Sequence, residues 1–259
     1  LVLDWWEVWS AAYWRGYLGP LAGSAAWLLQ RQIARMPHQP IAYSTLHASR
    51  LRRLRDGQPV PILRGLLPTA AALPTPYPAE LRVVYAGRHI VEKQAPAVVA
   101  GIARARERLP ALQATLFGDG PSFVETTRAV QAVGLEDAVE LPGFFVEPLL
   151  NEMLSRSLCL VLLSRREGYG LVVVEAAALG VPSVVLRHPD SAATELVIDG
   201  VNGVICESAA PDDVASAILG VYDAGDELRQ RTLGWFHQNA EALSVEGSLP
   251  RLLVIYRGA

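Results

Sequence analysis

The chain has 259 residues, of which 51% are hydrophobic and 19% charged, and it carries a formal net charge of -3 at pH 7. This composition is typical of globular proteins and excludes an intrinsically disordered chain, while the small negative charge gives no electrostatic basis for nucleic-acid binding. No apolar run approaches the roughly 20 residues that a membrane-spanning helix needs, so no transmembrane segment is expected.

The two cysteines indicate the cellular compartment in which the protein is expected. Cys159 lies in a predicted buried strand and Cys206 near the end of another, and neither has a partner at metal-ligand spacing. Both are predicted to be reduced core residues, which favours an intracellular, cytoplasmic protein.

The chain begins at Leu1 with Leu-Val-Leu-Asp, which is typical of the end of a strand. We therefore expect the chain to start inside a domain, as a fragment of a longer protein. An aromatic-rich segment follows and leads into a helix that ends near Met36, with a break at Gly19-Pro20. Its aromatic residues are Trp5, Trp6, Trp9, Tyr13, Trp14 and Tyr17. Because few basic residues accompany them, packing in a core or an acceptor cleft is favoured over an interfacial helix, and peripheral membrane contact stays open as the alternative.

Residues 41–43 and 59–63 are predicted to be short strands, with a helix at 45–55 between them. The arginines of this helix are interpreted as a solvated face: Arg50, Arg52, Arg53 and Arg55. Residues 67–80 contain Pro68, Pro74, Pro76 and Pro78, a composition that predicts a linker between domains.

From Leu81 onward, apolar strands and helical segments alternate with short turns, which predicts an α/β unit with a Rossmann-like parallel sheet flanked by helices. The predicted strands are residues 81–86, 112–117, 138–141, 158–163, 183–186 and 203–206. Helices at about 211–224 and 226–242 close this unit, and a last helix is expected at 244–256. Ligands of such sheets bind at the carboxyl ends of the strands, so the turns that follow the strands are the segments to examine.

The turn after the first of these strands carries two cations. Gly87 and Arg88 end the strand, and Lys93 begins the next helix. A guanidinium and an ammonium that converge there can neutralise the phosphates of a leaving nucleoside diphosphate. Either cation in isolation is interpreted as a surface charge, and the diphosphate role depends on the two cations together with the Glu pair described below.

The next turn, Gly118-Asp119-Gly120, is similar to the start of a dinucleotide-binding fingerprint. The position of the third glycine is Phe123, so the fingerprint is incomplete. His89 and His188 have no partner at metal-ligand spacing and are predicted to be surface or loop histidines.

Residues 164–180 are the most informative stretch. A buried strand ends at Ser164, Gly168 and Gly170 allow a tight turn, and residues 171–179 predict a helix that is apolar except for Glu175. A carboxylate in so apolar a helix should face a polar cavity or a ligand. Glu175 leans back toward the helix N-terminus, where Glu167 lies just ahead in the turn.

The two carboxylates therefore flank the amides of Gly170 and Leu171. Free amides at a helix N-terminus suit a phosphate, and carboxylates suit hydroxyl groups, so a nucleotide-sugar fits this stretch. The alternative is that Glu175 only complements the helix dipole and that Glu167 is a solvated turn residue.

Several of these segments, in this order, resemble retaining glycosyltransferases of family four, which have the GT-B fold. The resemblance runs from about Leu81 to Ala224. It rests on Glu167 and Glu175 with the Gly168-Tyr169-Gly170-Leu171 stretch between them, on Gly87-Arg88 separated from Lys93 by four residues, and on the turn at 118–121. This chain departs from the family at Gln94, where a Gly is common, and at Trp6-Glu7, where a loop often carries a His followed by an acidic residue.

The resemblance implies roles for named residues. The first Glu of the family signature contacts the hydroxyls of the donor sugar and the second grips the ribose, so these roles pass to Glu167 and Glu175. Arg88 and Lys93 would meet the diphosphate, and with Glu167 they form the candidate catalytic set. The remaining candidate donor-binding residues are Gly87, Gly118, Gly120, Gly143, Gly168, Tyr169, Gly170 and Leu171, where Gly143 lies in the turn beside the base. No metal and no cofactor other than the nucleoside-diphosphate sugar are expected.

The expected organisation is therefore the C-terminal half of a GT-B fold with a partial N-terminal α/β domain. Residues 1–66 would be the remainder of the acceptor-side domain, 67–80 a linker, 81–242 the donor-binding domain, and 243–259 a helix that packs back on the N-terminal part.

The expected function is transfer of a sugar with retention to an unknown acceptor, which could be a glycan, a lipid-linked saccharide or a small molecule, in the cytoplasm or at the cytoplasmic face of a membrane. The alternatives are a GT-B nucleotide-sugar epimerase or phosphorylase, and a non-catalytic nucleotide-sugar-binding module. The fragment alone is expected to bind a donor but to transfer slowly or not at all.

Overall fold

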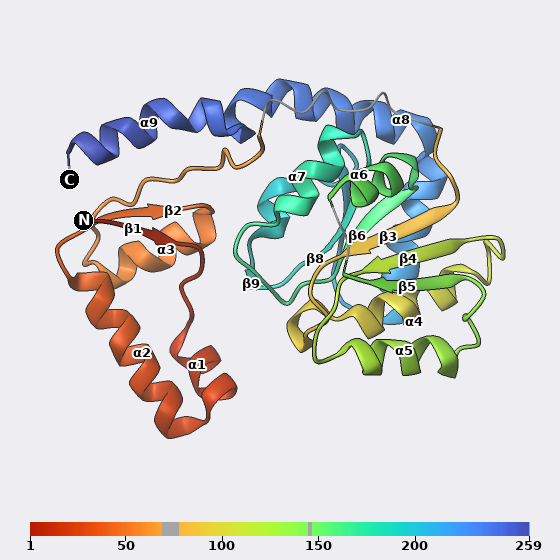
Figure 1. Ribbon diagram of the computed structural model, residues 1–259, viewed down its shortest axis with the longest axis horizontal. Helices are drawn as coiled ribbons and strands as arrows, with labels where there is room; N and C mark the ends of the chain where they lie inside the picture. Colours follow the sequence, from red (N-terminus) through yellow and green to blue (C-terminus); the bar gives the residue numbers. More distant parts are fainter. Residues whose placement is uncertain (69–77, 145–146, 259) are drawn as a thin grey trace. The chain divides into compact units, whose positions relative to one another are not determined.

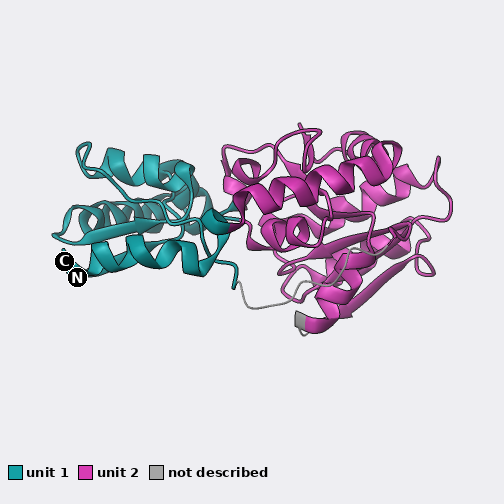
Figure 2. Cartoon of the chain, turned by 90° about the horizontal axis from the view of Figure 1, so that it is seen from above, with its two compact units in different colours: residues 1–69, 167–169, 241–259 teal, residues 70–166, 170–240 magenta. Residues whose placement is uncertain are grey.

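The computed structural model describes residues 1–68, 78–144 and 147–258, and Figure 1 shows their secondary structure. The chain forms two compact units (Figure 2). Unit 1 consists of residues 1–69, 167–169 and 241–259, and unit 2 of residues 70–166 and 170–240. Most of the predicted linker at 67–80 lies outside the described residues.

Unit 2 is built on a six-stranded sheet with the order β10-β8-β6-β3-β4-β5, in which all neighbours are parallel. The strands are β3 (Arg82–Ala86), β4 (Gln113–Phe117), β5 (Val139–Gly143), β6 (Cys159–Leu162), β8 (Ser183–Leu186) and β10 (Gly203–Cys206). The predicted parallel α/β fold is thus confirmed. The strand order reverses between β3 and β6, and this is the point at which sheets of this type bind ligands beyond their carboxyl ends.

Helices cover both faces of this sheet (Figure 1): α4 (Ala95–Ala105) and α5 (Phe123–Ala132) lie on one face, and α6 (Glu147–Arg156) and α7 (Leu171–Ala178) on the other. The long segment α8 (Pro211–Leu243) is two helices that meet at Gly225, where φ is 54° and ψ is -146°. This break agrees with the gap predicted between 224 and 226. Short elements complete the unit: η1 (Val91–Lys93), η2 (Ala192–Leu196) and β9 (Asp190–Ser191). The short strand β7 (Arg166–Glu167) begins with a residue of unit 2 and ends with one of unit 1.

The core of unit 2 follows from the alternation of side chains along each strand. Val83 and Tyr85 of β3 pack with residues of α4 and α8 in one cluster, whereas Val84 is buried outside that cluster. All four residues of β6 are buried, which explains its continuous apolar sequence. The two cysteines are free and buried as predicted, and burial raises the pKa of Cys159 to about 12 and of Cys206 to about 11, so both thiols are chemically quiet.

Unit 1 contains a parallel pair of strands, β1 (Val2–Trp5) and β2 (Gln39–Ala42), and four helices within the described residues. These are α1 (Ala11–Leu18), α2 (Pro20–Arg35), α3 (Thr45–Leu54) and α9 (Val245–Arg257). Gly19, with φ of 83°, separates α1 from α2, and Pro20 opens α2. Helix α9 is tied to the N-terminal segment by hydrogen bonds from Gly65 N to Ser248 Oγ at 3.1 Å and from Val245 N to Leu67 O at 3.0 Å.

Two predictions for unit 1 were wrong. Residues 59–63 form no strand in the described structure. Only Ile62 makes a bridge, to Ala42, because Pro59 and Pro61 lack the amide hydrogen that a ladder needs. Arg55 does not belong to a solvated face: it is 8% exposed and donates to the carbonyl oxygen of Ala34 at 2.7 Å. Ala34 lies in the last turn of α2, where a cation suits the unpaired carbonyls.

Candidate functional site

The candidate site lies on turns at the carboxyl edge of the unit 2 sheet. The turn after β3 carries Arg88 and Lys93, and the segment after β6 leads into α7, which carries Glu175. Since β3 and β6 are the neighbours at which the strand order reverses, both segments start at the topological switch point.

The turns after β3, β4 and β5 are interlocked by backbone hydrogen bonds. Gly87 N donates to Phe117 O at 3.2 Å, and His89 N donates to Asp119 O at 2.9 Å. Gly118 N donates to Gly143 O at 2.8 Å and so fastens the turn after β4 to the end of β5. These bonds hold the sequence-predicted residues Gly87, Gly118, Gly120 and Gly143 in one rigid edge.

The structure explains why residues 118 and 120 are glycines, and the sequence alone did not reveal this reason. A Cβ atom on Gly118 would lie 1.9 Å from the carbonyl oxygen of Gly87, and one on Gly120 would lie 2.5 Å from the carbonyl oxygen of His89. Gly118 also has φ of 123°, a value that residues with a side chain rarely adopt. Both glycines therefore let the two turns pack together, whatever their approach to a ligand.

His89 lies in a loop, which is one of the two places that the sequence predicted for it, but it is not on the surface. It is fully buried beneath the turns, its Nδ1 lies 3.2 Å from Thr126 Oγ1, and its ring contacts Tyr85 and Phe123. Burial holds its pKa below the ordinary value. His89 is therefore a neutral packing residue that supports the turn carrying Arg88.

We expect the stability of unit 2 to fall as the pH drops through about 6.5, the ordinary pKa of histidine. Because burial lowers the pKa of His89 in the folded state, the unfolded chain binds the extra proton first and gains stability from it. Urea unfolding of unit 2 at pH 8 and at pH 5.5 measures the loss of unfolding free energy between the two pH values. His89→Gln should make this loss smaller. Parallel pH profiles for the two proteins would show that His89 has no part in it.

Arg88 and Lys93 differ in their surroundings. The Arg88 side chain is exposed, and its carbonyl oxygen accepts a hydrogen bond from the buried Tyr85 hydroxyl at 3.0 Å. Lys93 ends η1 and is half-buried. The structure therefore places both cations on one turn at the switch point. The backbone of this turn is held by the hydrogen bond from the Tyr85 hydroxyl to the Arg88 carbonyl oxygen.

A set of contacts that the sequence did not predict ties η1 to the segment after β6. The Glu92 carboxylate lies 3.4 Å from the Arg166 guanidinium, with only 20% and 13% of the two side chains exposed. Arg165 N donates to Glu92 O at 2.8 Å, and the Gln94 side-chain amide donates to Leu163 O at 2.6 Å. These contacts couple the position of Lys93 to the segment that leads into the Glu167–Glu175 stretch.

Gln94 stands where the family commonly has Gly, and the structure gives the reason that Gly suits this place. Its φ is 54°, in the left-handed region, at the N-cap of α4. A side chain there is strained, and Gln94 offsets the strain through its hydrogen bond to Leu163. The departure from the family pattern thus keeps the backbone conformation and adds a contact.

Gln94→Ala should destabilise unit 2 by about 1 kcal/mol, because it removes the hydrogen bond and keeps the left-handed strain. Gln94→Gly removes the same side chain and also relieves the left-handed strain. Because that strain costs about 1 to 2 kcal/mol, Gln94→Gly should be more stable than Gln94→Ala. Denaturant unfolding of the pair measures the difference. Equal stabilities would mean that residue 94 is not held in the left-handed conformation.

The N-terminus of α7 is the third component of the site. Gly170 is its N-cap with φ of 101°, and no side chain in the described structure caps it. Leu171 is exposed at the first position of the helix, and Glu175 is half-buried one turn later. Uncapped amides beside a carboxylate form a surface that can accept both a phosphate and a hydroxyl group.

The predicted residues Glu167, Gly168 and Tyr169 belong to unit 1 (Figure 2). Tyr169 is buried, its hydroxyl donates to the carbonyl oxygen of Arg64, and burial keeps its pKa well above the usual range. A Cβ atom on Gly168 would lie 2.8 Å from the carbonyl oxygen of Trp6. The signature stretch therefore divides, with its first part packed in unit 1 and Gly170, Leu171 and Glu175 in unit 2.

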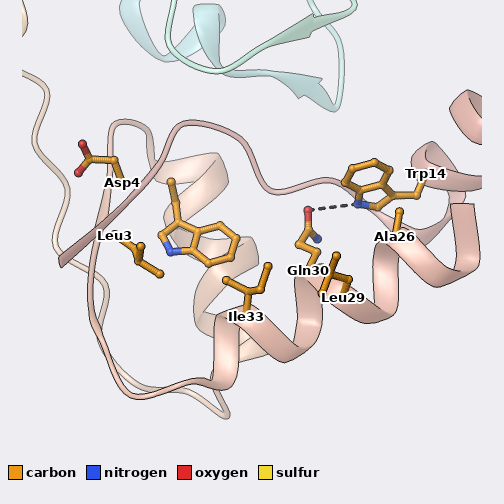
Figure 3. Close-up of a pocket in the computed structure, with 8 residues that line it drawn as sticks. Leu3, Asp4, Trp14, Ala26, Leu29, Gln30 and Ile33 are labelled. Carbon is orange, nitrogen blue, oxygen red and sulfur yellow. Dashed lines mark hydrogen bonds between the residues drawn. The ribbon is translucent and has the colours of Figure 1, made fainter. Parts of the chain in front are cut away.

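Unit 1 also has an apolar pocket of about 370 Å³ (Figure 3). Its lining residues are Leu3, Asp4, Trp5, Trp14, Ala26, Leu29, Gln30 and Ile33. Gln30 is buried, and its amide is occupied by Trp14 Nε1 at 3.2 Å, Trp9 N at 3.0 Å and Trp9 O at 2.9 Å. The pocket thus offers little for a phosphate or a sugar, and the aromatic segment packs around it.

Two properties of the described residues bear on the site and its setting. Across 1–68, 78–144 and 147–258, no group of three or more His, Cys, Asp and Glu side chains is placed to hold a metal ion. No helix in that same part of the chain is both long and apolar enough to span a bilayer.

Comparisons with known proteins agree with this geometry. A family model described as glycosyl transferases group 1 matches residues 75–232. Alpha-D-kanosaminyltransferase from Streptomyces kanamyceticus is 30% identical over 149 residues, which are 58% of this chain and 38% of that protein. Glycogen synthase from Mycobacterium tuberculosis (strain ATCC 25618 / H37Rv) is 33% identical over 163 residues, which are 62% of this chain and 37% of that protein. The chain therefore spans less than two fifths of the length of these two relatives.

Solved structures show the same fold. Sucrose-phosphate synthase from Thermosynechococcus elongatus matches with a TM-score of 0.81 at 21% identity, over 99% of this chain and 67% of that chain. Anabaena Alr3699/HepE in complex with UDP-glucose matches with a TM-score of 0.78 at 17% identity, over 100% of this chain and 72% of that chain.

Proposed function

Because this chain belongs to the glycosyl transferases group 1 family, we propose that it binds a nucleoside-diphosphate sugar and takes part in transferring the sugar to an acceptor. The observation that carries the proposal is the carboxyl edge of unit 2. Two cations on one braced turn and an uncapped helix N-terminus followed by a half-buried carboxylate all occur at the switch point of a parallel sheet.

Each group has a role in this proposal. Arg88 and Lys93 neutralise the diphosphate, with help from the amides of Gly170 and Leu171. Glu175 accepts hydrogen bonds from the ribose hydroxyls, and the turn at Gly143 approaches the base. Glu167 accepts hydrogen bonds from the hydroxyls of the donor sugar.

The chemistry follows from where charge develops. When the bond between the sugar and the diphosphate breaks, negative charge grows on the leaving oxygen, and cations fixed beforehand stabilise it most. We propose that configuration is retained and that the departing diphosphate accepts the proton of the acceptor on the same face of the sugar. Beyond the donor and the acceptor, this scheme requires neither a metal nor a cofactor.

Fold neighbours support the choice of ligand. Anabaena Alr3699/HepE was solved in complex with UDP-glucose, and a Staphylococcus aureus TarM mutant in complex with Fondaparinux, alpha-GlcNAc-glycerol and UDP. TarM matches this chain with a TM-score of 0.77 at 19% identity. By analogy we expect a uridine or another nucleoside diphosphate donor and a hydroxyl-bearing acceptor here.

One observation favours a second candidate, a non-catalytic nucleotide-sugar-binding module. Trp6 occupies the position at which the family loop often carries a His, and an indole cannot accept a proton there. A product assay with labelled donor separates the candidates: transfer yields a glycoside, an epimerase yields a second nucleotide-sugar, a phosphorylase yields a sugar phosphate when phosphate is supplied, and a binding module yields none of these.

Glu175→Gln should weaken binding of a nucleoside diphosphate about ten-fold, because a hydrogen bond to a charged acceptor contributes about 1.5 kcal/mol or more. A 2′,3′-dideoxy analogue should bind the parent chain as weakly and lose little more with Glu175→Gln, since protein group and ligand group are two ends of one contact. Calorimetry on the four combinations measures the coupling. Additive losses would remove Glu175 from the ribose site.

A further inference from the structure

Trp6 is an exposed aromatic residue on a rigid support. Half of its surface is exposed (50%), while Tyr43, on which it stacks, is only 7% exposed. The two ring centroids are 4.0 Å apart and the ring planes differ by 21°. The Tyr43 hydroxyl is in turn held by a hydrogen bond with the Asp4 carboxylate. The indole is therefore fixed from beneath, and ordering it on ligand binding costs little entropy.

The neighbours of Trp6 within unit 1 supply polar groups. Glu7 follows it, and the Glu7 carboxylate accepts a hydrogen bond from Trp9 Nε1 at 2.6 Å, which fixes its position. A Cβ atom added to Gly168 would lie 2.8 Å from Trp6 O and 3.1 Å from Glu7 Cγ. Trp6 and Glu7 thus lie directly against the loop that carries Glu167.

From this juxtaposition we propose that Trp6, with Glu7 and Glu167, forms a stacking subsite for a pyranose ring. This inference rests on the proposed function and names the part of the substrate that unit 1 recognises. One face of a pyranose presents C–H groups with a slight positive charge, which the negative face of an indole attracts, and the ring hydroxyls point outward toward acceptors. Two carboxylates are acceptors only, so they suit hydroxyl groups and disfavour a phosphate.

The same chemistry explains the residue type at position 6. An imidazole at this place can accept or donate a hydrogen bond through its ring nitrogens, whereas an indole has one N–H donor and a large apolar face. A Trp at position 6 therefore offers a larger stacking surface than a His would, but fewer hydrogen-bonding groups. The ring can belong to the donor sugar or to a saccharide acceptor, and the chemistry is the same in both cases.

The test uses the indole N–H signals of the ¹⁵N-labelled full chain, with the Trp6 signal assigned by Trp6→Phe. The probes are UDP, UDP-glucose, UDP-galactose and UDP-N-acetylglucosamine, and the methyl glycosides of the same sugars at high concentration. We expect the Trp6 signal to move with at least one sugar-containing probe and not with UDP alone.

Calorimetry then measures what Trp6 contributes to affinity. Trp6→Leu should weaken the responding probe roughly three- to ten-fold, the range of one aromatic contact, and Trp6→Phe should recover part of the loss. Tyr222→Ala, which removes a 42% exposed aromatic side chain from α8 in unit 2, is the matched control and should change nothing.

Each outcome has one meaning. Movement with a UDP-sugar assigns the ring to the donor, and movement with the glycosides alone assigns it to the acceptor. If glycosides move the Trp6 signal while no nucleotide binds, the subsite stands and the proposed donor function fails. If nucleotide-sugars bind while the Trp6 signal stays still with every probe, or if UDP alone moves it equally, the subsite is refuted and the donor function stands.

Discussion

Gly118→Ala should destabilise unit 2 by about 3 kcal/mol or more, the largest stability loss that we expect from a single methyl group in this chain. A Cβ atom at this position would lie 1.9 Å from the carbonyl oxygen of Gly87, and backbone cannot move aside as a flexible side chain can. Overpacking of this kind costs about 1 to 3 kcal/mol, and a side chain in the left-handed region adds about 1 to 2 kcal/mol. Denaturant unfolding of parent and variant measures the sum.

Gly134→Ala is the matched control. Gly134 also has a positive φ, 66°, but an added Cβ there meets nothing within 4 Å. It should therefore show only the conformational cost of about 1 kcal/mol. Equal losses for the two variants would contradict the close packing of the turns after β3 and β4 and, with it, the rigid base of the candidate site.

Lys93→Ala and Arg88→Ala should each weaken binding of a nucleoside diphosphate by roughly ten- to a hundred-fold, the equivalent of about 1.5 to 3 kcal/mol for a charge-assisted contact. Binding of the corresponding nucleoside should change little, because it has no phosphates. Isothermal titration of each variant with both ligands makes the comparison. The effect should be larger for Lys93, which is half-buried, than for the exposed Arg88.

The control for these variants is Arg104→Ala. Arg104 lies on α4 and forms ion pairs with Glu107 and Asp212, away from the turns at the carboxyl edge. Its loss should leave both affinities unchanged. If Lys93→Ala and Arg88→Ala weakened nucleoside and nucleoside diphosphate alike, the cations would not be phosphate ligands and the site would have to be reassigned.

The sheet of unit 2 could be predicted because its strands are short apolar runs, and β6, buried along its whole length, has no polar residue to confuse the pattern. Helix breaks were predictable for a similar local reason. Gly19-Pro20 and Gly225 lie within segments whose sequence otherwise favours a helix, and each interrupts it in the structure.

What could not be predicted depends on contacts between distant segments. The requirement for glycine at 118 comes from the turn at 87, the burial of His89 comes from α5, and the role of Gln94 comes from the end of β6. The prediction for Arg55 was wrong because its guanidinium donates to the carbonyl oxygen of Ala34, in another helix, and to that of His38. Periodicity and composition carry no information about such pairs.

The signature stretch shows the same limit within one motif. Its sequence predicts a single strand-turn-helix site, yet Glu167, Gly168 and Tyr169 are grouped with unit 1, where the Tyr169 hydroxyl donates to the carbonyl oxygen of Arg64. The ion pair of Glu92 with Arg166 joins the turn after β3 to the residue just before this stretch. Neither fact is visible in the spacing of the residues.

A calorimetric titration of the 259-residue chain with UDP, GDP and ADP, and with their glucose conjugates, would show whether unit 2 holds a nucleoside-diphosphate site. Far-ultraviolet circular dichroism and cooperative urea unfolding would first establish that unit 2 is folded. We predict that at least one nucleoside diphosphate binds at a single site and that Lys93→Ala weakens that binding at least ten-fold, the lower limit expected for a charge-assisted contact. Folded chain that binds none of these ligands, or binding that Lys93→Ala leaves unchanged, would contradict the assignment of the carboxyl edge of unit 2 as a nucleoside-diphosphate site.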